Sequence, residues 1–187
     1  MIPGGIYHVT SRGNRKEPIF LSDGDRILFL LLVKKVIARR RWLVHGYCLM
    51  ENHYHLLLET LEPDLSRGMQ TINGEYAQWF NRGHGFVGHV FQGRFHAAAV
   101  ESDWHLLQLT RYLALNPVRA GLCESPMQWL WSSFADTMRG AALCSLFRPT
   151  RFSPSSAPTR TKRIMRFDGS SRMPRSIERC LVRDTGV

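Results

Sequence analysis

The sequence predicts an α+β fold, a ferredoxin-like split βαβ antiparallel sheet with an added helix. Strand-like and helical patterns alternate along the chain in the order β-α-β-β-α-β-α, which is the split βαβ order with one further helix. Two strand-like runs are separated only by Glu51 and Asn52, so a β-hairpin is expected there. A hydrophobic content of 44% over 187 residues is enough for a core.

The first strand and the first helix follow from residue type and capping. Residues 6–12 are rich in β-forming residues and end at a Gly-Asn pair, after which a basic loop runs through Lys16. Ser22 or Asp23 can cap a helix whose apolar positions continue to Ile37. A run of three arginines follows, at the helix end that favours positive charge.

The hairpin and the second helix come next. Residues 42–50 and 53–59 form the two strands of the hairpin. Residues 65–81 have helical spacing of their apolar positions and end before an Arg-Gly-His-Gly sequence. The apolar positions of this helix are Leu65, Met69, Ile72, Tyr76 and Phe80.

The last two elements are a strand and a helix. A fourth strand is expected to run from Val87 to Val100, broken around residues 92–94. Asp103 begins a third helix. We expect this helix to end at or before Asn116, because Pro117 disfavours the helical conformation of the residue before it.

Charge divides the chain into two parts. The formal net charge is +10, and residues 148–187 hold ten of the 25 Lys and Arg but only three of the 15 Asp and Glu. Polyanions bind such proteins through phosphate neutralisation and counterion release. We expect one folded domain over residues 1–137 and a basic, flexible extension over residues 138–187, where Arg, Ser and Pro are frequent.

Nothing in the composition indicates a membrane or an oxidising compartment. The longest apolar run, residues 27–33, is far shorter than the roughly 20 residues of a membrane helix. The N-terminal residues lack the regions of a signal peptide, so a cytoplasmic location is expected. The four cysteines are far apart and form neither a disulfide framework nor a zinc motif: Cys48, Cys123, Cys144 and Cys180.

Two short motifs carry the candidate chemistry. Side chains alternate along a strand, so His53 and His55 share one face while Tyr54 points to the other, and two adjacent imidazoles can chelate one metal ion. Tyr112 and Asn116 are four residues apart and share a helix face. A tyrosine hydroxyl and an amide beside a two-histidine metal site could cut a phosphodiester through a covalent protein–DNA intermediate.

Alternatives to these assignments exist in the same sequence. A lone pair of histidines on a strand is more often a pair of polar surface residues. Tyr76 is the second candidate nucleophile, although it lacks an amide at the matching spacing. Gln108 lies four residues before Tyr112 and could replace Asn116 as a ligand or contact DNA.

Basic residues in three places are candidates for phosphate or base contacts. The glycine-containing loop after the first strand is suited to such contacts, although its composition also fits a solvated turn. Single arginines beside a glycine and after a proline are similar candidates. The full set of candidate DNA-binding residues is Arg12, Asn14, Arg15, Lys16, Arg94 and Arg119.

Five motifs, in order over roughly residues 1–137, together resemble a known family. They are the segments 7–14 (YHVTSRGN), 50–55 (MENHYH), 91–95 (FQGRF), 111–121 (RYLALNPVRAG) and 129–134 (WLWSSF). The chain resembles the HUH single-strand DNA transposases of the IS200/IS605 type, and most closely the REP-associated tyrosine transposases.

The resemblance implies a ferredoxin-like nuclease fold whose added helix is catalytic. It implies a divalent metal, Mg²⁺ or Mn²⁺, with His53, His55 and Asn116 as ligands and Tyr112 as the nucleophile. The expected activity is cleavage and rejoining of hairpin-flanked single-stranded DNA through a 5′-phosphotyrosine intermediate. A catalytically inactive relic that still binds the hairpin is the alternative function. We expect a monomer, with a dimer that exchanges tyrosine helices as the alternative.

Overall fold

The computed structural model describes residues 4–134 and 138. These residues belong to Met1–Thr150, the first of two units into which the chain divides, the second being Arg151–Val187. The expected basic extension therefore lies outside the described residues, apart from Met138. No helix among the described residues is long and apolar enough to cross a membrane.

A four-stranded antiparallel sheet and three helices make up the described fold, so the α+β prediction is confirmed. The strands lie in the order β2-β3-β1-β4, the ferredoxin-like arrangement. The strands are β1 (Gly5–Arg12), β2 (Leu43–Leu49), β3 (His53–Thr60) and β4 (His96–Ala99). The helices are α1 (Asp23–Arg40), α2 (Leu65–His84) and α3 (Asp103–Arg119).

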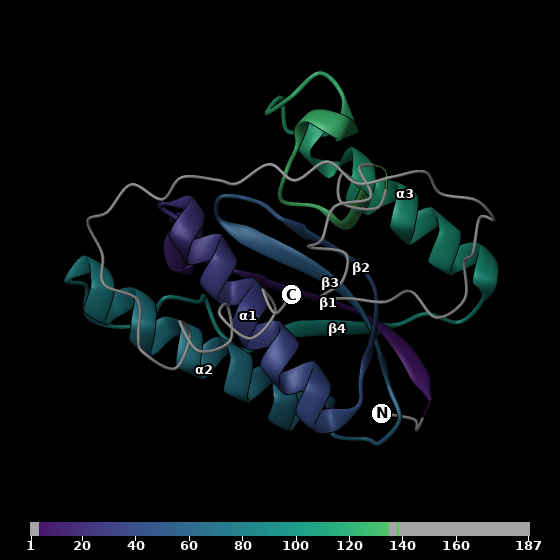
Figure 1. Ribbon diagram of the computed structural model, residues 1–187, viewed down its shortest axis with the longest axis horizontal. Coiled ribbons are helices and arrows are strands. Elements are labelled where there is room, and N and C mark those ends of the chain that lie inside the picture. The colour runs from purple at the N-terminus through teal and green to yellow at the C-terminus, as the bar shows by residue number, and fades with distance from the viewer. Residues whose placement is uncertain (1–3, 135–137, 139–187) are drawn as a thin grey trace, which may run out of the picture. The chain divides into compact units, whose positions relative to one another are not determined.

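Helices α1 and α2 cover one face of the sheet (Figure 1). Tyr54 on β3 points to this face, where its ring lies 4.6 Å from that of Phe29 on α1 and its hydroxyl donates to Asn73 of α2 at 2.6 Å. All five apolar positions predicted for the second helix are buried: Leu65, Met69, Ile72, Tyr76 and Phe80. The periodicity of the sequence therefore identified the packing face of α2 correctly.

Helix α3 lies on the opposite face of the sheet (Figure 1). Its buried Leu113 forms a core cluster with Cys48 and Met50 of the hairpin and Leu57 of β3. Because side chains alternate along β3, His53 and His55 share the face of Leu57, opposite to Tyr54. The two histidines and α3 are consequently on the same side of the sheet.

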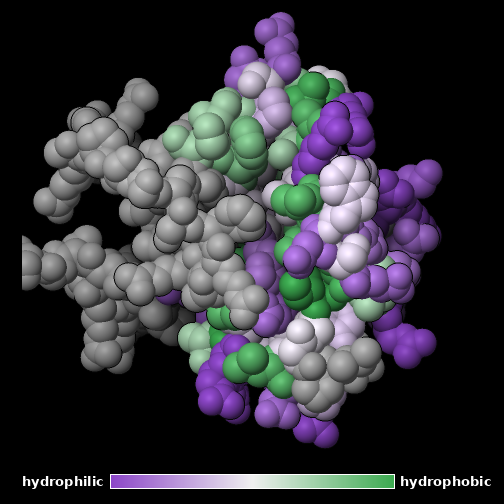
Figure 2. Space-filling model, turned by 90° about the vertical axis from the view of Figure 1, so that its right-hand side faces the viewer, coloured by the Kyte–Doolittle hydropathy of each residue, from purple (hydrophilic) through white to green (hydrophobic). Residues whose placement is uncertain are grey.

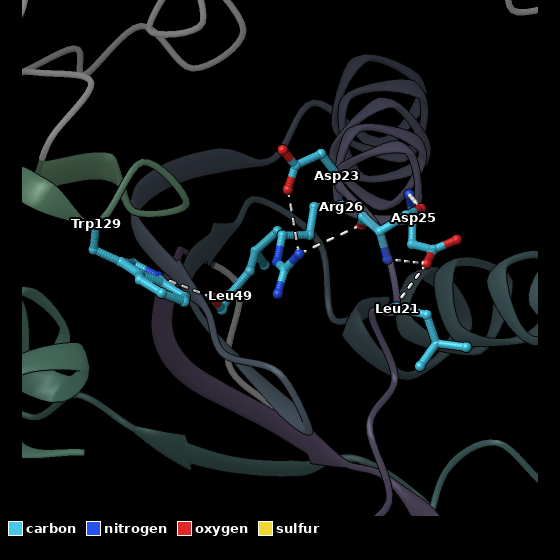
Figure 3. A network of polar contacts seen from close by, with 7 residues as sticks. Leu21, Asp23, Asp25, Arg26, Leu49 and Trp129 are labelled. Carbon is cyan, nitrogen blue, oxygen red and sulfur yellow. Dashed lines mark hydrogen bonds and ion pairs between the residues drawn. The ribbon is translucent and has the colours of Figure 1, made fainter. Parts of the chain in front are cut away.

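The start of α1 is held by the predicted cap and by α2. Ser22 accepts a hydrogen bond from the Asp25 amide at 3.2 Å, and the Asp25 carboxylate accepts from the amides of Leu21 and Ser22 at 2.8 Å (Figure 3). The other carboxylate oxygen of Asp25 lies 2.9 Å from Nε2 of His84, at the end of α2. This capping box therefore joins the two helices on that face.

The segment after α3 returns to the outer edge of β2. The Trp129 indole donates to the carbonyl of Leu49 at 3.0 Å (Figure 3), and the amide of Leu49 donates to the carbonyl of Trp131 at 2.8 Å. Backbone groups at an edge strand are otherwise open to pairing with another chain. This contact covers the end of β2 next to the hairpin turn.

Two predicted boundaries were wrong. The fourth strand is only His96–Ala99, preceded by a single bridge between Gly13 and Phe91. Helix α3 does not stop at Asn116 but passes through Pro117 to Arg119. Proline removes a single backbone donor, and in the last turn the helix still closes with the Ala120 amide donating to the carbonyl of Asn116 at 3.0 Å.

Candidate active site

The two histidines of β3 form the centre of the site. Their ring centroids are 5.0 Å apart with the planes at 84°, and His55 is 6% exposed. Burial lowers the pKa of His53 to about 4, with the charge of Arg12 contributing, and lowers that of His55 to about 3, with His53 and His8 contributing. Both imidazoles are therefore neutral near pH 7, the form that binds metal ions.

Helix α3 brings Tyr112 and Asn116 to these histidines. The Asn116 side-chain nitrogen lies 3.4 Å from Nε2 of His55, and the Tyr112 ring centroid lies 5.5 Å from that of His55 at 90°. Leu113 and Pro117 are buried and anchor this part of α3. Tyr112 itself is 36% exposed. The structure thus brings together all four residues predicted for the centre of the site.

The competing residues from the sequence occupy other places. Tyr76 is fully buried on the α1 and α2 face, where its hydroxyl donates to the carbonyl of Ile19. Gln108 is exposed on α3. Asn116 is 9% exposed and contacts His55 directly, so Asn116 lies at the histidine pair.

A further histidine belongs to this cluster. His8 on β1 lies with its Nε2 2.9 Å from Nδ1 of His55, and the two rings stack with centroids 5.1 Å apart. Its ring centroid is 6.4 Å from that of Tyr112. Sequence analysis missed it as a site residue. The sequence shows only that His8 and Thr10, two residues apart, share one face of their strand. That this face is the one that carries His55 becomes known only from the pairing of Thr10 with His55.

Asn52, in the hairpin turn, supports the other histidine. Its Oδ1 lies 2.7 Å from Nδ1 of His53, and its Nδ2 donates to the carbonyl of Lys16 at 3.0 Å. Lys16 ends the basic turn Asn14–Lys16, in which Arg15 and Lys16 have positive φ angles of 53° and 64°. Asn52 therefore links the predicted DNA-binding loop to the histidine pair.

The donor set fits a divalent cation. Nδ1 of both His53 and His55 is occupied by a neighbouring side chain, so the Nε2 atoms are the ones left for a metal ion. Among the described residues no three His, Cys, Asp or Glu side chains are grouped to hold a metal. A third protein ligand here would be the amide oxygen of Asn116. Two imidazoles are softer ligands than Mg²⁺ usually prefers, so this set would suit Mn²⁺ or Zn²⁺ as well.

Two of the predicted basic residues lie at the cluster. Arg12 is paired with His53 across β1 and β3, and its charge contributes to lowering the pKa of His53. The Arg119 guanidinium carbon lies 5.7 Å from the centre of the Tyr112 ring. Because α3 continues past Pro117, Arg119 extends the same helix and remains beside Tyr112.

The remaining basic candidates are exposed around the end of β1. The three residues of the turn Asn14–Lys16 are all exposed. Arg94 is exposed in the segment before β4, and the amide of Gln92 in that segment donates to the carbonyl of Arg12 at 2.9 Å. These residues are therefore accessible to a polyanion at the end of the sheet where Arg12 of β1 pairs with His53 of β3.

The outer surface of α3 combines apolar and polar residues. Trp104 is 69% exposed and Leu107 is 52% exposed, both on the turns before Tyr112. Figure 2 shows apolar side chains interspersed with polar ones on the face at the right of Figure 1, where α3 begins. A mixed surface of this kind can accommodate both bases and phosphates.

Comparison with known proteins identifies a family and a solved structure of the same fold. A family model described as "Transposase IS200 like" matches residues 3–116. A solved REP-associated tyrosine transposase bound to a REP hairpin shares the fold, with 20% identity and a TM-score of 0.61 over 88% of this chain and 95% of that chain. A Deinococcus radiodurans protein assigned as a transposase has 14% identity and a TM-score of 0.43 over 57% of this chain and 86% of that chain. No curated protein matches.

Proposed function

The chain belongs to the IS200-like transposase family, and we propose that it cleaves and rejoins hairpin-flanked single-stranded DNA through a covalent link to Tyr112. The observation that supports this most directly is the meeting of Tyr112 with the neutral pair His53 and His55. Their association depends on α3 packing over the same sheet face. Tyr112 is 36% exposed beside the buried His55 and the partly buried His53, both neutral, so its hydroxyl would be accessible to DNA over the two imidazoles.

The proposed reaction is a transesterification. The Tyr112 hydroxyl oxygen bonds to phosphorus and its proton passes to solvent, while the bond from phosphorus to the 3′ oxygen breaks and that oxygen takes up a proton. The products are a 5′-phosphotyrosine and a free 3′-hydroxyl. A second 3′-hydroxyl can then displace Tyr112, so the energy of the phosphodiester is kept for rejoining.

The residues around Tyr112 have separate roles in this proposal. His53, His55 and the Asn116 amide would hold Mg²⁺ or Mn²⁺, which when bound supplies Lewis-acid activation of the scissile phosphate. Asn52 orients His53 through the 2.7 Å contact at Nδ1. Arg119, beside the Tyr112 ring, would pair with the phosphate on which charge develops.

We propose single-stranded DNA with a hairpin as the substrate. The solved relative with the same fold is bound to a REP hairpin. Phosphate contacts position a nucleic acid on a protein, and exposed bases stack on aromatic side chains such as Trp104. The proposed phosphate contacts are Arg12, Asn14, Arg15, Lys16, Arg94 and Arg119. The active site described above is assembled within one chain, so we propose a monomer.

The test is a covalent-adduct assay. The purified full chain is incubated with labelled hairpin DNA from its own genomic flanks, with Mn²⁺ or Mg²⁺ or with EDTA, and resolved on a denaturing gel. We expect a metal-dependent protein–DNA band that disappears in Tyr112→Phe and persists in Thr110→Ala, an exposed neighbour on the same helix. Cleavage that survives Tyr112→Phe without an adduct would contradict the nucleophile. Binding without cleavage under both metals would favour the inactive relic.

A further inference from the structure

We propose that His8 is a positioning residue that fixes the tautomer and the ring orientation of His55, so that Nε2 of His55 faces Asn116 and Tyr112. This role extends the proposed function, and its importance for catalysis rests on that function. His8 lies on β1, next to β3 in the sheet, and on the face that meets α3. It reaches His55 through Nδ1, the nitrogen on the side away from Asn116.

The contact between His8 and His55 is both a hydrogen bond and a ring stack. Nε2 of His8 lies 2.9 Å from Nδ1 of His55, and the ring planes are inclined by only 15° with centroids 5.1 Å apart. The strand register places His55 opposite Thr10, so His8 approaches along the diagonal of the ladder. Two constraints therefore act on the His55 ring, one on its proton and one on its plane.

The direction of this hydrogen bond follows from the other side of His55. The side-chain nitrogen of Asn116, which can only donate, lies 3.4 Å from Nε2 of His55. Nε2 is then the acceptor and carries no proton, which leaves the proton of a neutral ring on Nδ1. Nδ1 donates it to Nε2 of His8. The lone pair of Nε2 in His55 is thus directed toward Asn116, and a metal ion bound there would take the place of this contact, with the Asn116 amide turned so that its oxygen is the ligand.

His53 shows the same arrangement with a different partner. Nδ1 of His53 lies 2.7 Å from Oδ1 of Asn52, and the amide nitrogen of Asn52 is engaged with Lys16, so Oδ1 is the acceptor. Both histidines of the pair thus have an acceptor at Nδ1. An acceptor of this kind fixes the tautomer of a metal-binding histidine and raises its basicity. His8 serves His55 as Asn52 serves His53.

The position of His8 indicates that it supports the His55 ring and does not itself bind the metal ion. A third imidazole ligand would direct a nitrogen at the shared metal position on the Nε2 side of His53 and His55. His8 instead directs Nε2 at Nδ1 of His55 at hydrogen-bond distance. No group of three His, Cys, Asp or Glu suited to a metal occurs in residues 4–134. The loss of His8 should therefore change the His55 ring first, and metal affinity as a consequence.

The first arm of the test measures the tautomer without metal. Full-length protein labelled with ¹⁵N in histidine is studied by long-range ¹H–¹⁵N correlation in the presence of EDTA. We expect the Nδ1–H tautomer for His55 in the wild type and in His8→Gln, whose side-chain oxygen can accept the bond. His8→Phe keeps a stacking ring without an acceptor, and His8→Leu is a second variant without one. In both we expect a mixture with the Nε2–H tautomer, because the 3.4 Å contact with Asn116 that remains is longer than an ordinary hydrogen bond and holds the proton on Nδ1 only weakly. An unchanged His55 tautomer in these two variants would overturn the proposal.

The second arm measures Mn²⁺ affinity by calorimetry. We expect about 10- to 100-fold weaker binding in His8→Phe, the usual effect of losing such a partner, and recovery of most of it in His8→Gln. His45→Ala is the matched control, because His45 lies on β2 and pairs with Glu59 outside the cluster, and it should bind as the wild type does. Equal losses in His8→Gln and His8→Phe, or the same loss in His45→Ala, would refute a role through the acceptor atom.

The two arms separate this inference from the proposed function. If the wild type binds no Mn²⁺, the proposed metal site fails, whereas the tautomer measurement still decides whether His8 controls His55. If Mn²⁺ binds and the tautomer does not respond to His8, the metal site stands and the inference is wrong. Equal melting temperatures of the variants are required, and His8→Gln supplies the folded comparison if His8→Phe does not fold.

Discussion

Acidification should destabilise the metal-free protein through the buried His55 and the partly buried His53. Their pKa values in the folded chain are about 4 for His53 and about 3 for His55, whereas the ordinary value of a histidine is 6.5. Below pH 6.5 the unfolded chain takes up protons that the folded chain does not. Stability is therefore fully present above about pH 6.5 and is lost progressively as the pH falls toward the folded pKa values.

The size of the effect follows from the same values. At pH 5 an unfolded histidine is about 1.5 pH units below its pKa, and each unit corresponds to about 1.4 kcal/mol. The buried His55 should therefore cost about 2 kcal/mol of stability between pH 7.5 and pH 5, and the two histidines together somewhat less than about 4 kcal/mol, because His53 is partly exposed and its effect is screened by solvent. That is a large part of the about 5 to 15 kcal/mol by which a domain is stable.

Urea denaturation in EDTA at pH 7.5, 6.0 and 5.0, followed by circular dichroism, measures this dependence. Substituting both residues, His53→Gln with His55→Gln, should remove most of the slope between pH 7.5 and 5.0. His45→Gln is a matched control, because this histidine lies on β2 and pairs with Glu59 outside the site. An equally steep slope in the double variant would refute the assignment of the buried neutral pair. A slope abolished by His45→Gln alone would do the same.

Three further predictions concern helix α3. Asn116→Ala should weaken Mn²⁺ binding by about tenfold in calorimetry, as the loss of a ligand or its partner does. Gln108→Ala should leave the affinity unchanged, and the reverse result would assign the ligand to Gln108. Leu113→Ala should lower the free energy of unfolding by about 2 to 5 kcal/mol in urea, because Leu113 is 2% exposed over the sheet, and a change near zero would mean that α3 is not packed there. Arg119→Gln should weaken binding of hairpin DNA in fluorescence anisotropy and reduce the salt slope by about one phosphate contact. An unchanged salt slope would exclude Arg119 from the DNA path.

The position of the site depends on the edge-to-edge order of the sheet. Strand β3, which carries the histidine pair, lies between β2 and β1 and is buried on both faces. His53 and His55 are thus held on a central strand, while Tyr112 comes from a helix with an exposed outer surface. In the proposed function, the nucleophile therefore belongs to the more accessible layer and the metal ligands to the less accessible one. The fold produces this arrangement because the largely buried sheet carries the histidines and the more exposed helix α3 carries Tyr112.

Local patterns in the sequence were enough for much of the fold and the site. Alternation along a strand predicted that His53 and His55 face away from Tyr54, and helical spacing predicted that Tyr112 and Asn116 share a face. Both follow from the geometry of one element and need no information about its neighbours. Local rules predicted the ends of elements less well. The rule that a helix stops before proline was wrong for α3, because Pro117 lies in the last turn, where the helix tolerates it.

Which side chains share a face within one element can be worked out from the sequence alone, whereas which of these faces meet depends on the tertiary structure. The contact of His8 illustrates the difference, because its partner His55 lies 47 residues away and is reached through the register of β1 on β3. A shift of that register by one residue would turn His8 to the opposite face. Register and helix placement are set by packing across the whole sheet, and no short stretch of sequence contains that information.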